Sequence, residues 1–211
     1  MSRRAWASAL PFALVFWLAI GIVFGVVRAS GLPTHSWLGA KSYDTALTGT
    51  AATCSLGAAT GTDSVWAAVT GSASLDIIQV GALLSNGQPR YFMAWGKGEP
   101  NAAGSAYTEV DLGPADRGAH RYSVQKSTLS ANWFLSIDGR SQLLPDSFRT
   151  WSIRAGQVQN EVQQPEPMGP VSCSAMRTAH GVLWTTPVWS FGGAGPSSNV
   201  PMFFGSDWFI S

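Results

Sequence analysis

A single amide side chain, Gln79, stands inside an otherwise apolar strand that the sequence predicts over residues 76–84 (DIIQVGALL). The neighbouring isoleucines, valine and leucines suit a buried sheet. A buried amide without a hydrogen-bond partner costs about 1–3 kcal/mol. Gln79 is therefore either satisfied by neighbouring backbone groups, or it faces a cleft and has a functional role there.

The elements that would position this residue are short strands separated by turns. The dipeptides Asn86-Gly87 and Asp138-Gly139 are strong hairpin signals. Outside the N-terminus no long stretch has a helical period, and regularly spaced short strands predict an all-β sandwich or jelly roll. The expected strands cover residues 64–71, 76–84, 90–96, 120–127, 132–139, 151–163 and 170–179.

The composition favours an exported, β-rich protein. Of the 211 residues, 45% are apolar and only 12% are charged, about half the usual charged share. Low charge, together with 23 glycines and 10 tryptophans, argues against a disordered chain or a helical bundle. The formal net charge is +1 and there is no basic run, so nothing in the sequence indicates a nucleic-acid partner.

The N-terminus carries the strongest single signal. Residues 5–27 contain no charge, and about 20 apolar residues suffice to cross the hydrocarbon core of a bilayer. Arg3 and Arg4 place the N-terminus in the cytoplasm by the positive-inside tendency, which leaves the remaining chain in the periplasm or outside the cell. A cleaved signal peptide with Ala29 near the cut site is the alternative, although its apolar region usually has only about 7–15 residues.

The two cysteines, Cys54 and Cys173, both lie in the exported part, where a disulfide is the expected state. The bond would close a loop of more than 100 residues. The alternative is a pair of buried free thiols. His35, His120 and His180 have no ligand spacing with these cysteines, so the sequence predicts neither a metal site nor a cofactor.

Four short motifs follow one another along the chain: VWAAVTG, IIQVGALL, PRYFMAWGKG and NEVQQPEPMGPVSCSAM. Their order and spacing resemble those of the glutamic peptidases (eqolisins) and their bacterial relatives. In that family a W-V-G strand precedes a Q-x-G strand, a Y-x-x-W-x-E-W strand follows, and an acidic residue later opens an E-W-I strand. The resemblance covers about residues 45–180 and implies a concanavalin-like or jelly-roll β-sandwich.

By this resemblance Gln79 matches the catalytic glutamine of the family and Glu161 its catalytic glutamate. A glutamate can act as general base on a water that attacks a peptide carbonyl, and a glutamine amide can donate to the oxyanion. Both side chains would then have to point into one face. The alternative for Glu161 is a partly exposed strand residue paired with Arg90 or Arg154.

The motifs also depart from the family pattern. An acidic position is occupied by Ala94, the glycine of W-V-G is replaced at Ala68, and the aromatic after the glutamate is replaced by Val162. These losses, with the predicted anchor, favour a non-enzymatic binding module or an accessory or assembly subunit of a membrane protein complex. The alternatives are an acid-acting glutamic endopeptidase and a lectin-like, glycan-binding module.

Aromatic residues supply the remaining candidate binding sites. Trp66, Trp95 and Trp133 either pack in the core or form a platform on which sugars stack. The C-terminal arm, residues 186–211, either folds back on the sandwich or docks on a protein or a bilayer. The domain organisation expected is an anchor at 1–29, a linker at 30–45, the sandwich at 46–185 and this arm. The aromatic residues of the arm that we expect to bind are Trp189, Phe203, Phe204, Trp208 and Phe209.

Overall fold

The structure is a computed structural model that describes residues 35–57, 63–71, 76–85, 87–96, 107–144, 153–163, 169–194, 202–204 and 207–210. Every regular element within these ranges is a β-strand. No helix in this part of the chain is long and apolar enough to cross a membrane. The predicted anchor, residues 5–27, lies outside the described residues and stays a prediction.

The described strands form two antiparallel sheets, as the sequence predicts. Sheet A has seven strands in the order β13-β1-β10-β3-β4-β5-β6. Its members are β13 (Ser190–Ala194), β1 (His35–Tyr43), β10 (Ile153–Gln163), β3 (Asp63–Gly71), β4 (Ile77–Ser85), β5 (Gln88–Gly96) and β6 (Thr108–Pro114).

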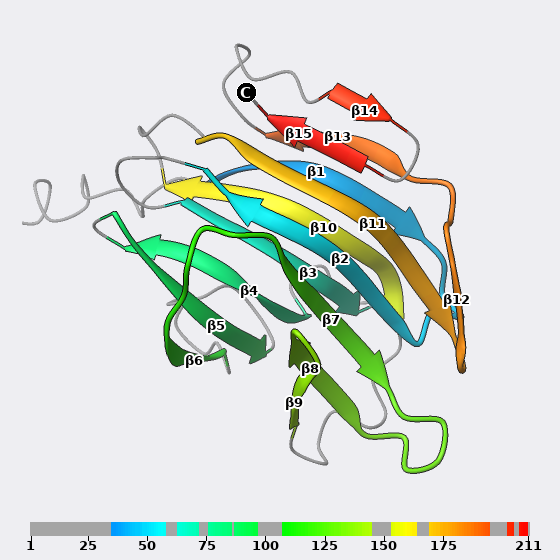
Figure 1. Cartoon of the computed structure of the whole chain (residues 1–211). Coiled ribbons are helices and arrows are strands. Elements are labelled where there is room, and N and C mark those ends of the chain that lie inside the picture. Colours follow the sequence, from blue (N-terminus) through cyan, green and yellow to red (C-terminus); the bar gives the residue numbers. More distant parts are fainter. Residues whose placement is uncertain are drawn as a thin grey trace, which may run out of the picture. The chain divides into compact units, whose positions relative to one another are not determined.

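Sheet B has the order β14-β15-β11-β2-β7-β8-β9, with β12 paired to β11. The two sheets run as two layers in Figure 1, with β11, β2 and β7 over β10, β3 and β4. The strands of sheet B are β14 (Met202–Phe204), β15 (Asp207–Ile210), β11 (Val171–His180), β2 (Gly49–Leu56), β7 (His120–Lys126), β8 (Trp133–Ile137), β9 (Arg140–Leu143) and β12 (Leu183–Thr185).

One hydrophobic core fills the space between the sheets. Because side chains alternate along a strand, every second residue of β3 and β4 reaches this core, and the next residue points away from it. Val65 and Val80 of sheet A, and Val124 and Met176 of sheet B, are all fully buried there. The β-sandwich predicted from the strand pattern is therefore confirmed.

Two segments bear on the predicted domain organisation. Within the predicted linker, residues 30–45, the chain instead forms β1, whose Leu38 and Ala40 pack on the core cluster. The arm after residue 185 folds back on the sandwich, one of the two alternatives given by the sequence, and adds β13 to sheet A and β14 and β15 to sheet B. Trp189 is only 8% exposed and belongs to the core. The large apolar residues of β1, Trp37, Leu38 and Tyr43, do not alternate with polar ones, which is why β1 resembles a linker in the sequence.

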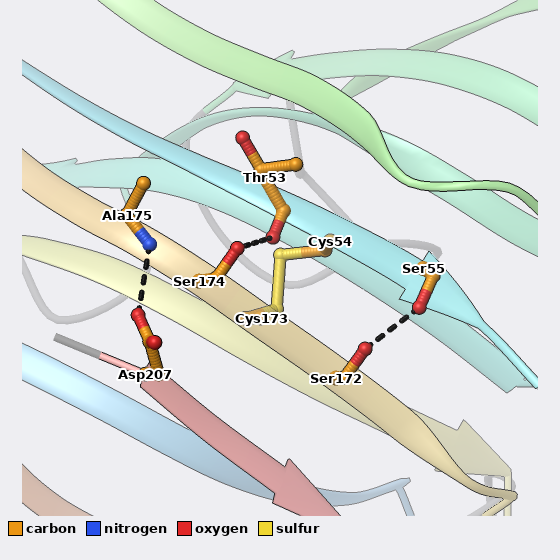
Figure 2. The surroundings of a disulfide bond; sticks show 8 residues. All are labelled: Thr53, Cys54, Ser55, Ser172, Cys173, Ser174, Ala175 and Asp207. Carbon is orange, nitrogen blue, oxygen red and sulfur yellow. Dashed lines mark hydrogen bonds between the residues drawn. A yellow bond between two sulfur atoms is a disulfide. The ribbon is translucent and has the colours of Figure 1, made fainter. Parts of the chain in front are cut away.

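The predicted disulfide is present. Cys54 of β2 and Cys173 of β11 face each other across neighbouring strands, 119 residues apart in sequence (Figure 2). Both are buried in the core. Beside the bond, β11 has a bulge in which Ala175 adopts a positive φ of 50° and donates its N–H to Asp207 instead of to a strand partner.

Candidate functional site

Gln79 and Glu161 lie on the same side of sheet A. Ile78 and Val80 point into the core, so Gln79 between them points away from sheet B. The same alternation around Val158 of β10 turns Glu161 away from the core. We call this side of sheet A, which carries Gln79, Trp66 and Glu161, the outer face. Strands far apart in the sequence thus bring both predicted catalytic side chains to one face.

The outer face carries a second apolar cluster. Trp66, Ala68, Phe92 and Ala94 are each at most 4% exposed, and Tyr107 is among the partly buried residues that pack on them. These side chains are therefore buried against one another and against their neighbours. The cluster provides the low-dielectric surroundings in which hydrogen bonds and charges act strongly.

A glycine makes room for the largest member of this cluster. Gly81 is paired with Trp66 on the neighbouring strand. A Cβ at Gly81 would come within 2.8 Å of the Cα and Cβ of Trp66, closer than real contacts allow. Gly81 therefore lets β4 lie close to the backbone of Trp66 on β3, the strand between those of Gln79 and Glu161.

Gln79 is 7% exposed, and its Nε2 donates a hydrogen bond of 2.8 Å to the hydroxyl of Tyr107. The amide is therefore satisfied by a side chain and not by the neighbouring backbone groups that the sequence suggests. Burial, with the charges of Glu109 and Glu161, raises the pKa of Tyr107, although the bond from Gln79 opposes this. The phenol consequently keeps its proton, and that proton remains available to a third group.

Glu161 is half-buried and lies against Trp66, whose Nε1 donates to Glu161 Oε2 across 3.3 Å. The Ser64 hydroxyl donates to the backbone oxygen of Glu161. Arg90, one of the two expected ion-pair partners, binds Asp111 instead, with Nε donating to Oδ2 across 2.7 Å. The indole N–H orients a carboxylate without neutralising it, which suits a group that must accept a proton.

A second carboxyl group, Glu109 of β6, belongs to the same electrostatic neighbourhood. Desolvation, and then the negative charges of Asp111 and Glu161, raise the pKa of Glu109. Glu109 therefore takes up a proton at a higher pH than an ordinary glutamate. The outer face combines the Glu161 carboxyl group, a second carboxyl that protonates at a higher pH than usual, a neutral phenol and an amide.

The strand register fixes how these groups are spaced. Gln79 lies in one row across sheet A with Ala94 and Glu109 on one side and with Ala68 and Gln157 on the other. Glu161 is four residues further along β10 than Gln157. Its hydrogen bond goes to Trp66, which lies between it and the Gln79 row, whereas Gln79 bonds to Tyr107 on the far side. The two side chains share a face and are not hydrogen-bonded to each other.

The arrangement of strands matches solved peptidase structures. Over 83% of this chain and 97% of the other, the structure superposes on scytalido-glutamic peptidase with a peptide-based transition-state analogue, with a TM-score of 0.64 and 12% identity. With the same coverage it superposes on SCP-B, an eqolisin peptidase in a complex with the tripeptide Ala-Ile-His, with a TM-score of 0.62 and 11% identity. The fold is similar to that of the glutamic peptidases. No family model and no curated protein matches the sequence.

Three tryptophans, Trp66, Trp95 and Trp133, were one candidate for a sugar-binding platform, but their rings do not lie on one surface of the protein. Trp66 lies on the outer face, whereas Trp95 packs on the inter-sheet core from the opposite side of sheet A. Trp133, 1% exposed, lies in that core on β8 of sheet B. A common platform of these three rings is therefore wrong. The predicted binding residues Phe203, Phe204, Trp208 and Phe209 lie on β14 and β15, and their side chains are outside the description.

Two residues of the site, Tyr107 and Glu109, were not predicted from the sequence. They lie at the start of the segment YTEVDLG, most of which forms the edge strand β6. Successive side chains of this segment point to opposite faces of the strand. The alternation of Tyr107, Glu109 and Asp111 is the signal that could have revealed this strand. Its polar residues on both faces make it weaker than the apolar alternation of β4.

Proposed function

We propose that this protein is a glutamic-peptidase-like hydrolase that binds a peptide over the outer face of sheet A. Glu161 is the general base and Gln79 is the oxyanion donor. The observation that carries the proposal is that both side chains project from this face, one held by Trp66 and the other by Tyr107. The similarity to peptidase folds supports the same reading.

The chemistry follows from the groups present. The Glu161 carboxylate accepts a proton from a water, and that water attacks the scissile carbonyl carbon. The negative charge that develops on the carbonyl oxygen is stabilised by the N–H groups of Gln79. Collapse of the tetrahedral intermediate breaks the C–N bond, and the leaving amine takes the proton back from Glu161.

Tyr107 gives this mechanism a third group. It accepts from Gln79, so its own O–H is free to donate, and its raised pKa keeps it neutral. For the oxyanion to reach Gln79, the amide either donates its second N–H or exchanges Tyr107 for the substrate oxygen. Cleavage is expected in acid, at about pH 3–5, near the ordinary pKa of carboxyl groups.

Two other functions rest on different residues. The accessory-subunit hypothesis depends on residues 5–27 and on aromatic side chains of β14 and β15, which lie outside the described part, and no observation supports it. The glycan-binding hypothesis loses the platform of Trp66, Trp95 and Trp133. The hydrolase agrees better with the fold.

Digestion of a mixed peptide library by the purified protein, read by mass spectrometry at pH 4 and pH 7, tests the proposal. We expect cleavage at pH 4 that Glu161→Gln abolishes and that Gln79→Leu reduces at least a hundredfold, as for loss of an oxyanion donor. Asp44→Asn, which removes a carboxylate that pairs with His180, is the matched control and should cleave normally. No cleavage by the wild type, or full activity of Glu161→Gln, would overturn the proposal.

A further inference from the structure

Lys41 lies near the other end of the Gln79 row and interacts electrostatically with a second cation, Arg154. Lys41 of β1 is on the outer face, because Leu38 and Ala40 of the same strand pack on the core. Its partner across the strands is Gln157, in the row of Gln79. Arg154 of β10 is near enough that its charge lowers the pKa of Lys41, in addition to the larger effect of partial burial.

Among the described residues, no carboxylate forms an ion pair with either cation. The ion pairs of arginine and histidine with acids in this part of the chain involve Arg90, His120 and His180. Placing two like charges side by side, with one of them half-buried, is unfavourable without an anion. The pair therefore has an unmet requirement for negative charge.

An aromatic ring fixes the position of the Lys41 ammonium group. Its Nζ lies 4.2 Å from the ring centroid of Trp37. Trp37 is four residues before Lys41 on β1, so both side chains lie on the same face of the strand. A cation held over an indole has less freedom than an ordinary surface lysine. Gly39 between them carries no side chain, and a Cβ there would lie 2.9 Å from the Cγ of Gln159 on the neighbouring strand. The ammonium is thus held at a defined place on the outer face.

The distance from this pair to Gln79 corresponds to a short peptide. Lys41 and Gln79 are separated by β10 and β3, so three strand spacings of about 4.8 Å put their backbone positions about 14 Å apart. An extended peptide advances about 3.3–3.6 Å per residue. A carboxylate at Lys41 would therefore belong to a residue about four positions from a carbonyl held at Gln79.

We propose that Lys41 and Arg154 form a subsite that binds a carboxylate of the peptide, about four residues from the bond that is cleaved. This proposal rests on the proposed function, since it takes a peptide as the ligand. The carboxylate is either the C-terminus of the peptide or an aspartate or glutamate side chain. Either would neutralise the pair, and the site would then select acidic or short C-terminal substrates.

Binding to the non-cleaving Glu161→Gln variant separates these possibilities. The probes are four fluorophore-labelled peptides of one library-derived sequence, with glutamate or glutamine at the fourth position and with a free or an amidated C-terminus. Fluorescence anisotropy gives Kd. We expect the carboxylate peptides to bind at least tenfold more tightly than the neutral one, and Lys41→Met to remove this preference while Lys41→Arg keeps most of it.

Lys126→Met is the matched control, because Lys126 also lies over a tryptophan, Trp133, at 5.7 Å, but on sheet B. It should leave all four affinities unchanged. Equal binding of charged and neutral peptides would overturn the subsite and leave the proposed function standing. Failure of every peptide to bind wild type and variant alike would overturn both. Preference for only the free C-terminus, or only the glutamate side chain, identifies the source of the carboxylate.

Discussion

The side chains of Gln79 and Tyr107 meet across strand β5, with 2.8 Å between the amide nitrogen and the phenol oxygen. The residue of β5 that pairs with Gln79 is Ala94, which is fully buried. A methyl group at this position leaves the outer face free for the contact. Ala94 replaces an acidic residue of the glutamic-peptidase motif. The side chain of Gln79 therefore passes over this replaced position to reach Tyr107.

Removing the Tyr107 hydroxyl should leave a buried amide unsatisfied. We expect Tyr107→Phe to lower the free energy of unfolding by about 1–3 kcal/mol, because the desolvation of Gln79 is no longer compensated. Urea denaturation followed by tryptophan fluorescence measures this. In the double variant Gln79→Leu/Tyr107→Phe both polar partners are gone, so most of the loss should be recovered. If the loss of stability in the double variant equals the sum of the losses in the two single variants, the two side chains do not form a direct hydrogen bond.

The disulfide should supply a large part of the stability of the sandwich. Cys54 and Cys173 are 119 residues apart, and the chain-entropy model gives about 5 kcal/mol for a loop of this size. The variant Cys54→Ala/Cys173→Ala should therefore unfold at a much lower urea concentration than the oxidised protein. Reductant should destabilise the wild type and leave the double variant unchanged. A wild-type midpoint that does not respond to complete reduction would show that the bond contributes little.

His120 links the loop between β6 and β7, which carries Asp116, to the turn between β8 and β9, which carries Asp138. We call these three residues the histidine clamp. His120 Nδ1 lies 2.7 Å from Asp138 and Nε2 lies 2.8 Å from Asp116, and the Tyr91 hydroxyl lies 3.0 Å from Nε2. Burial alone would lower the pKa of His120, but the bonds to the two aspartates outweigh it and raise that pKa. The pKa of Asp116 is lowered chiefly by its hydrogen bond to His120. In Asp138, hydrogen bonds from His120 and from the Arg121 N–H outweigh desolvation and lower the pKa.

These directions define a pH window for the clamp. Stability from a raised histidine pKa is fully present below its ordinary value of 6.5 and is lost as the pH rises through the higher folded value. Stability from the lowered aspartate pKa values is present above 3.8 and is lost as the pH falls through the lower folded values. The thermal unfolding temperatures of the wild type and of His120→Gln should therefore differ most between pH 3.8 and pH 6.5. A difference that is constant from pH 3 to pH 9 would show that the clamp is not charged.

The sequence predicts the central strands well because burial on one or both faces leaves a strong pattern. The apolar run around Gln79 and the Asn86-Gly87 turn predict β4 and the start of β5 to within a few residues. Strands β1 and β6 lack this pattern. β1 has Gly39 and Ala40 at its centre, and β6 alternates polar residues, so neither has the apolar period on which the prediction depends.

The candidate site was predictable only in part, and for a different reason. Gln79 is conspicuous because an amide is out of place among apolar neighbours, and Glu161 follows from the family resemblance. Tyr107 and Lys41 join the site through strand order alone, since β6 and β1 lie far from β4 in sequence. Register across seven strands is a property of the whole sheet, and no local pattern encodes it.

Polar atoms without partners in the core lead to a further prediction about stability. Asn160 is fully buried between the sheets, and neither its Oδ1 nor its Nδ2 has a hydrogen-bond partner. The hydroxyl of Thr178, also fully buried, is in the same condition. Leucine has the same number and branching of side-chain heavy atoms as asparagine and no polar atom, so we expect Asn160→Leu to raise the free energy of unfolding by about 1–3 kcal/mol. Thr178→Val keeps the shape of the side chain and should have a smaller effect of the same sign. Urea denaturation of the two variants measures both effects, and a loss of stability in both would mean that buried water bonds to these groups in the native protein.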